Sequence, residues 1–274
     1  PPLAVDGPLL SIRKFAKERI DMDKLIQIGS VPQSVADLLV GIVRARRNVL
    51  ISGGTGSGKT TMLNAMSAFI DGRERIITIE DAAELQLQQV HVARLETRPA
   101  NIEGRGEVPQ RELVKNALRM RPDRIIVGEV RGGEAFDMLQ AMNTGHEGSM
   151  TTVHANTCRD ALSRVEQMIG MTGFELPTRS MRAQIASALH VVIQLERMSD
   201  GKRRLVSLQE ITGMEGEVVS MQEIFRFRRE STDSEGMIHG RYVTTGIRPK
   251  FVTEFDARGI EVPDRIFDPN HVLE

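Results

Sequence analysis

A glycine-rich loop that ends in lysine and threonine is the chemically most informative segment of the chain. Residues 53–60 match the P-loop pattern G-x-x-x-x-G-K-[ST] in full. Its glycines let successive backbone N–H groups point inward at phosphate oxygens. We expect Lys59 to contact the β- and γ-phosphates and the Thr60 hydroxyl to bind Mg²⁺. The expected nucleotide-binding residues are Gly53, Gly54, Thr55, Gly56, Ser57, Gly58, Lys59, Thr60 and Thr61. A glycine-rich turn without a ligand is the disfavoured alternative.

Three carboxylates follow the apolar run at residues 76–79. They are Glu80, Asp81 and Glu84. Nucleotide hydrolysis needs carboxylates to organise the metal and to orient or deprotonate water. The spacing ranks none of the three above the others, and a strand end in solvent or a helix cap is the alternative for Glu80 and Asp81.

A second apolar run, at residues 124–127, is followed by Gly128 and Glu129. This is the Walker B arrangement, with Glu in place of the more usual Asp. A carboxylate after a buried strand is costly unless a partner such as a metal shell awaits it. We therefore expect Glu129 to join Thr60 in holding Mg²⁺.

A third run, at residues 151–154, ends in His154. This histidine could donate a hydrogen bond to a γ-phosphate, and a structural role is an equally good interpretation. A zinc site of His146, His154 and Cys158 is disfavoured, because the spacings of eight and four residues match no common zinc motif and no fourth ligand is nearby.

Short strands separated by helical patterns must position these residues, which predicts a parallel α/β sheet. We expect strands at residues 49–52, 76–79, 125–127, 151–154 and 190–195. We expect helices at residues 32–47, 59–70, 110–120, 133–142, 158–169 and 178–189. After about residue 201, shorter periods and glycine-containing breaks indicate hairpins. Since ligands bind at the carboxyl ends of parallel strands, the P-loop and the carboxylates should converge.

Length and charge restrict the function classes. The 274 residues carry 36 Lys+Arg against 37 Asp+Glu, which excludes a protein that coats nucleic acid or an anionic membrane through bulk charge. A single Cys favours a reducing compartment. The longest apolar run, residues 35–43, is interrupted by Asp37, so no transmembrane segment is expected.

Taken in order, the motifs resemble those of the ATPases of the type II/type IV secretion superfamily, and within it the CpaF-like ATPases of Tad/Flp pilus systems. The matching segments are residues 53–60 (Walker A), 78–84 (the aspartate box), 95–104, 118–132 (Walker B) and 144–156 (the histidine box). The resemblance implies a RecA-like P-loop NTPase core with a mainly parallel sheet at residues 31–200. The change of pattern after residue 201 predicts a smaller C-terminal α+β region at residues 201–274. The resemblance also implies that residues 1–30 are the end of a truncated N-terminal domain with its linker.

The resemblance also implies roles for single residues. Glu84 would be the catalytic carboxylate, Glu129 the Walker B glutamate and His154 the sensor of the γ-phosphate, while His146 of the histidine box would also face the nucleotide. Lys59 would complete the catalytic set, with ATP and Mg²⁺ as substrate and cofactor.

Arginines concentrate in the middle of the chain. Residues 94–131 contain eight Arg and one Lys against six acidic residues. A cation near the transferred phosphoryl group stabilises its developing charge, and a neighbouring subunit often supplies it. The candidates for nucleotide-facing or subunit-bridging roles are Arg13, Arg94, Arg98, Arg105 and Arg131. A solvated charged face is the alternative for each of them.

The function implied by the resemblance is a homo-hexameric, ATP-hydrolysing motor, cytoplasmic and peripheral at the inner membrane. It would act on an inner-membrane platform protein to assemble, or also retract, a pilus or to drive secretion. A nucleic-acid translocase on the same core is the alternative, and an aromatic share of 4% disfavours it because single-strand tracking uses stacking platforms. No nucleic-acid partner is therefore expected. A nucleotide-gated scaffold without turnover is a third possibility.

Overall fold

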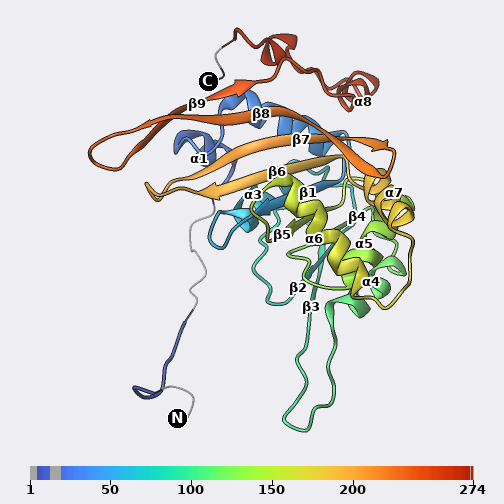
Figure 1. The fold of residues 1–274 in the computed structure, drawn as a ribbon. Coiled ribbons are helices and arrows are strands. Elements are labelled where there is room, and N and C mark those ends of the chain that lie inside the picture. Colours follow the sequence, from blue (N-terminus) through green and yellow to red (C-terminus); the bar gives the residue numbers. More distant parts are fainter. Residues whose placement is uncertain (1–4, 13–19, 272, 274) are drawn as a thin grey trace.

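The computed structural model describes residues 5–12, 20–271 and 273, and the strands of this part form one twisted, nine-stranded sheet (Figure 1). The strand order is β3-β2-β4-β5-β1-β6-β7-β8-β9. Six parallel strands form one side of the sheet. They are β1 (Val49–Gly53), β2 (Ile76–Glu80), β3 (Val92–Glu96), β4 (Arg124–Val127), β5 (Met150–Val153) and β6 (Val191–Arg197). The predicted α/β class with a mainly parallel sheet is confirmed.

Three antiparallel strands continue the same sheet beyond β6. They are β7 (Arg203–Glu215), β8 (Val218–Thr232) and β9 (Ile238–Thr244). These strands lie where the sequence predicts hairpins. The region after residue 201 therefore shares its hydrogen-bonded sheet with the P-loop strand, and its first strand runs alongside β6.

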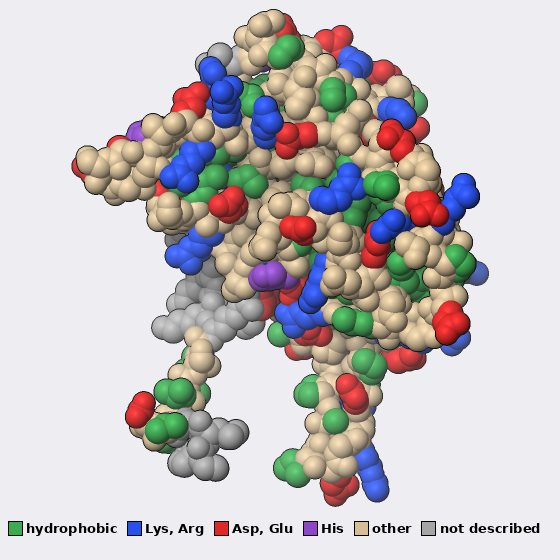
Figure 2. Space-filling model, viewed as in Figure 1, with side chains coloured by type: hydrophobic (Ala, Val, Ile, Leu, Met, Phe, Trp, Pro, Cys, Tyr) green, Lys and Arg blue, Asp and Glu red, His purple; other side chains and the backbone are tan. Residues whose placement is uncertain are grey.

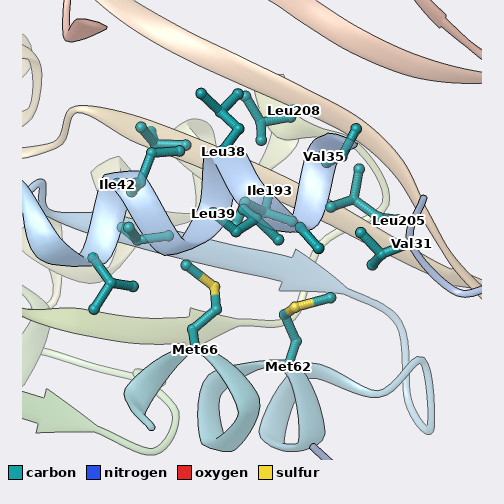
Figure 3. Close-up of a cluster of buried hydrophobic side chains, with 14 of the residues drawn as sticks. Val31, Val35, Leu38, Leu39, Ile42, Met62, Met66, Ile193, Leu205 and Leu208 are labelled. Atoms are coloured by element: carbon teal, nitrogen blue, oxygen red, sulfur yellow. The ribbon is translucent and has the colours of Figure 1, made fainter. Parts of the chain in front are cut away.

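One face of the sheet is covered by helices from both ends of the described chain. They are α1 (Met22–Gln27), α2 (Gln33–Arg44), α3 (Lys59–Ser67), α8 (Val252–Ala257) and the 3₁₀ helix η1 (Asp264–Phe267). The apolar positions of α2 recur at helical spacing, so one side of this helix is buried between α3 and the strands (Figure 3). Gly41 is needed there because a Cβ would lie 2.5 Å from the ring of Phe255.

The other face carries four helices and a second apolar cluster. They are α4 (Gln110–Leu118), α5 (Glu134–Asn143), α6 (Cys158–Gly170) and α7 (Thr178–Ala188). The strands β1, β2, β4 and β5 are buried on both faces by these two layers. Such burial holds the carboxyl ends of the strands in fixed positions, and loops from these ends carry the predicted site residues. In the described part of the chain, no helix is both long and apolar enough to cross a membrane.

A narrow arm at residues 97–109 leaves the body between β3 and α4 (Figure 1). Arg98 and Val108 exchange backbone hydrogen bonds at its base, N to O at 3.1 and 2.8 Å. Near its tip, the side chain of Asn101 accepts from the backbone N–H of Glu103 and Arg105, and Ile102 is exposed. Figure 2 shows acidic and basic side chains along this arm.

Candidate nucleotide site

The P-loop connects β1 to α3 and depends on glycine at several positions. Gly58 is the N-cap of α3 at a φ of 98°, and Gly56 has a φ of 68°, both in the left-handed region that favours glycine. A Cβ on Gly53 would lie 2.5 Å from the carbonyl oxygen of Leu195. Backbone conformation at Gly56 and Gly58 and close packing at Gly53 therefore require glycine, in a loop at the start of a helix whose free N–H groups favour anions.

Lys59 folds back over this loop. Its Nζ donates to the carbonyl oxygens of Gly53 at 3.0 Å and Gly54 at 3.1 Å. Burial lowers the pKa of Lys59, and Glu129, whose Oε1 lies 3.9 Å from Nζ, opposes that shift. The ammonium group therefore lies between the loop carbonyls and the Walker B carboxylate.

A cavity of about 1120 Å³ opens over the P-loop, at the carboxyl ends of β2, β4 and β5. The structure brings most of the predicted site residues to its lining. They are Thr55, Gly56, Ser57, Gly58, Lys59, Thr60, Thr61, Glu84, Glu129, Arg131 and His154. Gly53 and Gly54 are not among the lining residues, but their carbonyl oxygens accept hydrogen bonds from Lys59, which lines the cavity.

Arg131 joins the loops that follow β2 and β4. Its Nη2 and Nε donate to Oε2 of Glu129 at 2.5 and 2.8 Å, and its Nη1 donates to Oδ2 of Asp81 at 3.0 Å. These hydrogen bonds, chiefly the one to Glu129, raise the pKa of Arg131. The side chain is nonetheless 66% exposed, so this cation lies at the mouth of the cavity.

The three carboxylates after β2 have different surroundings. Glu80 is only 4% exposed, and its Oε1 accepts from the backbone N–H of Glu84 at 2.9 Å and of Leu85 at 2.8 Å. Burial raises the pKa of Glu80. Glu84 is half-buried and lines the cavity, whereas Asp81 is exposed and binds Arg131. The structure thus separates carboxylates that the sequence spacing could not rank.

His154 follows β5, is exposed and lines the cavity. Thr152 aligns the neighbouring strand ends, because its Oγ1 donates to the carbonyl oxygen of Gly128 at 2.7 Å and its own carbonyl accepts from Val130 N at 2.9 Å. Cys158 lies buried in the apolar core, and this burial raises the pKa of its thiol to about 12. Such a thiol remains protonated and is a poor metal ligand at neutral pH.

Several predicted site residues lie away from the cavity lining. Arg94 donates from Nη2 to the carbonyl oxygens of Leu85 at 2.9 Å and Ala83 at 3.3 Å, and so supports the loop that carries Glu84. Arg98 and Arg105 lie on the arm. His146 precedes β5, which places it at the opposite edge of the sheet, with its backbone N–H bonded to the carbonyl of Ala141. The prediction for Arg13 falls outside the described residues.

Arg203 also lines the cavity, although no sequence motif indicates it. It lies at the start of β7, and its Nε donates to the carbonyl oxygen of Gly56 at 2.8 Å. Lys202 and Arg164 line the same cavity, as do the apolar side chains of Ile20 and Met168. Only the antiparallel return of β7 alongside β6 brings Arg203 to the P-loop, and no local motif signals that contact.

The cavity offers suitable ligands for Mg²⁺. Thr60, in the first turn of α3, and Glu129 both line it and supply hard oxygen donors. Mg²⁺ usually takes few protein ligands and completes its shell with phosphate oxygens and water. The described residues contain no group of three or more His, Cys, Asp or Glu side chains arranged for a metal. A site of this kind, completed by nucleotide, therefore fits the residues present.

A P-loop between the first strand and its helix, with acidic residues at two neighbouring strand ends, defines a nucleotide-hydrolysing core of the RecA-like class. Comparison with known proteins identifies the family. The sequence model of the family described as "Type II/IV secretion system protein" matches residues 1–243, and the chain belongs to this family. It is an ATPase of the kind found in secretion and pilus systems.

Three relatives illustrate the match. A putative conjugal transfer protein of Mycobacterium tuberculosis (strain H37Rv) is 41% identical over 239 residues, which is 87% of this chain and 67% of that protein. The VirB11 ATPase of the Brucella suis type IV secretion system aligns with a TM-score of 0.58 and 28% identity over 72% of this chain and 60% of that one. The pilus retraction motor PilT aligns with a TM-score of 0.51 and 26% identity, over 71% and 53% respectively.

Proposed function

We propose that this chain is the Mg²⁺-dependent motor subunit of a type IV secretion or pilus machine, and that it hydrolyses ATP in the P-loop cavity. The observation that carries this proposal is the convergence of Lys59, Glu84, Glu129 and His154 on one cavity. They come from four separate segments, at the ends of β1, β2, β4 and β5. If each of them had only a structural role, there would be no reason for all four to line the same cavity.

Each side chain has a distinct task in this proposal. Lys59 moves from the loop carbonyls to the β- and γ-phosphates. Thr60 and Glu129 would hold Mg²⁺, which would supply charge neutralisation at the phosphates. Glu84 orients the attacking water and accepts its proton, while His154 donates a hydrogen bond to the γ-phosphate. Arg131 lies beside Glu129 and stabilises the charge that develops on the transferred phosphoryl group.

The remaining arginines suit contacts between subunits. Arg98 and Arg105 lie on the projecting arm and are not among the residues that line the cavity. An arm of this kind can reach a neighbouring copy, and an arginine supplied from a neighbour is a common device in nucleotide hydrolysis. We therefore propose a homo-hexamer in which the arm contributes to the interface, with Arg13 and His146 as further candidates for contacts between copies.

We infer the partner and the place of action by analogy with the relatives. The VirB11 ATPase belongs to a type IV secretion system, and a curated relative is named for conjugal transfer. By analogy, this chain would work in the cytoplasm, peripheral to the inner membrane, against a membrane-embedded platform protein. Assignment to a CpaF-like Tad/Flp pilus system remains a prediction of the sequence motifs.

The direct test of the active site is release of phosphate from ATP with Mg²⁺ by the wild-type chain and by Glu84→Gln. We expect turnover to fall about 100- to 1,000-fold in the variant, because loss of a general base removes a contribution of that order. Binding of a nonhydrolysable ATP analogue should persist. Glu235→Gln, an exposed carboxylate at the β8–β9 turn, is the matched control and should retain full turnover. Undiminished turnover in Glu84→Gln would contradict the assignment.

Native mass measurement with and without the nonhydrolysable analogue tests the assembly. A hexamer in the presence of the analogue supports the proposed ring, and a monomer under both conditions contradicts it. Adding single-stranded DNA to the phosphate-release assay at moderate salt separates the alternative function. A motor for protein movement should show no stimulation, whereas strong stimulation would indicate a nucleic-acid translocase.

A further inference from the structure

Glu80 differs from the other acidic residues of the cavity in how its carboxylate is used. It is the last residue of β2 and is 4% exposed. One oxygen, Oε1, accepts two consecutive backbone N–H groups, from Glu84 at 2.9 Å and Leu85 at 2.8 Å. This carboxylate therefore closes the loop of residues 80–85 on itself.

The same loop is held from its other side by Arg94. The guanidinium donates to the carbonyl oxygens of Ala83 and Leu85, so Glu80 binds the N–H groups and Arg94 binds the C=O groups of nearly the same residues. The side chain of Leu85 is 1% exposed and packs in the apolar cluster with α2 and α3. Glu84 is thus placed by backbone contacts on both sides and by a buried neighbour.

The neighbouring strand end leaves room for this arrangement. Gly128 follows β4, its N–H donates to the carbonyl of Ile79 at 2.9 Å, and a Cβ at Gly128 would lie 3.0 Å from Cγ of Glu80. Only a residue without a side chain leaves Glu80 undisturbed at this approach. Gly128 therefore helps to keep the loop of residues 80–85 in place.

We propose that Glu80 is a positioning residue that fixes Glu84 for catalysis by holding the backbone N–H groups of Glu84 and Leu85 on one carboxylate oxygen. This inference rests on the proposed role of Glu84 as the group that activates water. A base must lie within hydrogen-bond reach of the water it deprotonates, and small displacements cost large factors in rate. Glu80 acts through geometry and does not touch the reacting atoms.

Two substitutions of Glu80 separate this role from direct catalysis. Glu80→Ala removes the acceptor, so we expect kcat to fall about 10- to 100-fold with little change in KM for ATP, since the P-loop is untouched. Glu80→Gln provides an amide oxygen that can still accept from both N–H groups, so its kcat should stay within about threefold of the wild-type value. If Glu80→Ala does not fold, Glu80→Asp takes its place with the same expectation, because its shorter side chain holds the accepting oxygen farther from both N–H groups.

Glu210 offers a matched structural control. It is 3% exposed, and its two carboxylate oxygens accept from the backbone N–H groups of Lys250 at 3.0 Å and Phe251 at 2.9 Å, outside the cavity lining. Glu210→Ala therefore removes the same kind of buried acceptor. It should lower Tm and leave kcat of the folded protein unchanged, whereas Glu80→Ala should lower kcat.

A double variant completes the test. In the Glu84→Gln background, Glu80→Ala should cause no further loss of kcat, because a positioning residue has no effect once the group it positions is gone. Wild-type kcat in Glu80→Ala, or a Glu80→Gln variant as inactive as Glu84→Gln, would overturn the inference while leaving the ATPase assignment intact. Full turnover in Glu84→Gln alone would instead overturn the proposed function on which the inference rests.

Discussion

The two edges of the parallel sheet use the same residue types in opposite ways. At the carboxyl edge, Lys59, Glu129 and Arg131 line an open cavity, and Arg131 is two-thirds exposed. At the amino edge, Arg124 is 1% exposed and donates four hydrogen bonds to oxygens of Glu74, Val43 and Gly148. Its Nε and Nη2 donate to the carboxylate of Glu74, each at 2.7 Å.

The difference teaches how charge can be divided between stability and chemistry. The Nη1 of Arg124 also donates to the carbonyl oxygens of Val43 and Gly148, so this buried cation joins three separate segments. The donors of this guanidinium are engaged by protein oxygens, and removing one partner of such a pair is costly. At the carboxyl edge, the charged groups of Lys59, Glu129 and Arg131 line the cavity, where they can bind a ligand. The comparison predicts that substitutions at the two edges affect different quantities.

The largest effect is expected at the amino edge. Arg124→Ala removes a fully buried guanidinium and leaves the half-buried Glu74 with its longer ion pair to Arg46, at 3.5 Å, so it should lower the free energy of unfolding by about 3 kcal/mol. Denaturant titration measures this loss. Arg119→Ala, an exposed arginine just after α4, should change the same quantity by less than about 0.5 kcal/mol. Equal losses in both variants would break the distinction between the edges.

Lys59→Ala should give the reverse pattern at the carboxyl edge. We expect the rate of phosphate release to fall by at least about 100-fold, since a cation at the transferred phosphoryl group contributes on that scale. Tm without nucleotide should be nearly unchanged, because the desolvation of the lysine offsets its two hydrogen bonds to loop carbonyls and its 3.9 Å ion pair with Glu129. A large drop in Tm would show that this lysine also serves the fold.

A smaller effect concerns pH at the amino edge. Nδ1 of His190 accepts from the backbone N–H of Asn48 at 2.9 Å, and burial lowers the pKa of His190 to about 4. The unfolded chain takes up this proton near pH 6.5, so the neutral form stabilises the fold above that pH. Stability should fall as pH drops from 6.5 toward 4, by about 1–2 kcal/mol at pH 5. His190→Asn keeps an acceptor without titrating, and its unfolding should show a weaker pH dependence in this window.

The smallest effect is expected for Arg203→Gln. Loss of the hydrogen bond to the Gly56 carbonyl should loosen the P-loop and raise KM for ATP about three- to tenfold, as expected for about 1 kcal/mol. Kinetics at varied ATP concentration measure the change. Arg228→Gln, on an exposed part of β8 outside the cavity lining, is the control and should leave KM unchanged. An unchanged KM in Arg203→Gln would show that this arginine does not contribute to ATP binding.

The sequence predicted the carboxyl edge well because its signals are local. The P-loop, the two acidic strand ends and His154 each follow an apolar run, and parallel pairing then brings the strand ends together. Most predicted helices and strands agree with the structure to within three residues at each end. The sequence pattern does not predict β3, the outermost strand of the sheet. This strand pairs only with β2 among the described strands, and its residues are partly or fully exposed, so it lacks the apolar run that marks the other parallel strands.

Contacts between distant segments could not be predicted in this way. The pairs Arg124–Glu74 and Arg203–Gly56 join residues 50 and 147 positions apart, and no motif marks either one. His146 and His154 are close in sequence, yet β5 lies between them. Four strand residues span roughly 13 Å, so the two histidines lie at opposite edges of the sheet. The histidine motif predicts that both residues face the nucleotide, whereas His154 lines the cavity and His146 lies at the other end of β5.

The most direct test of the distinction between the edges is the thermal shift produced by a nonhydrolysable ATP analogue with Mg²⁺. At about 100 times Kd, we expect the wild-type chain to gain roughly 5 °C in Tm, because a ligand that binds only the folded state stabilises it. Lys59→Ala should lose this shift. Arg73→Ala, at the amino edge with a side chain that is 90% exposed, should keep it in full. An undiminished shift in Lys59→Ala, or a lost shift in Arg73→Ala, would contradict the assignment of nucleotide binding to the carboxyl edge.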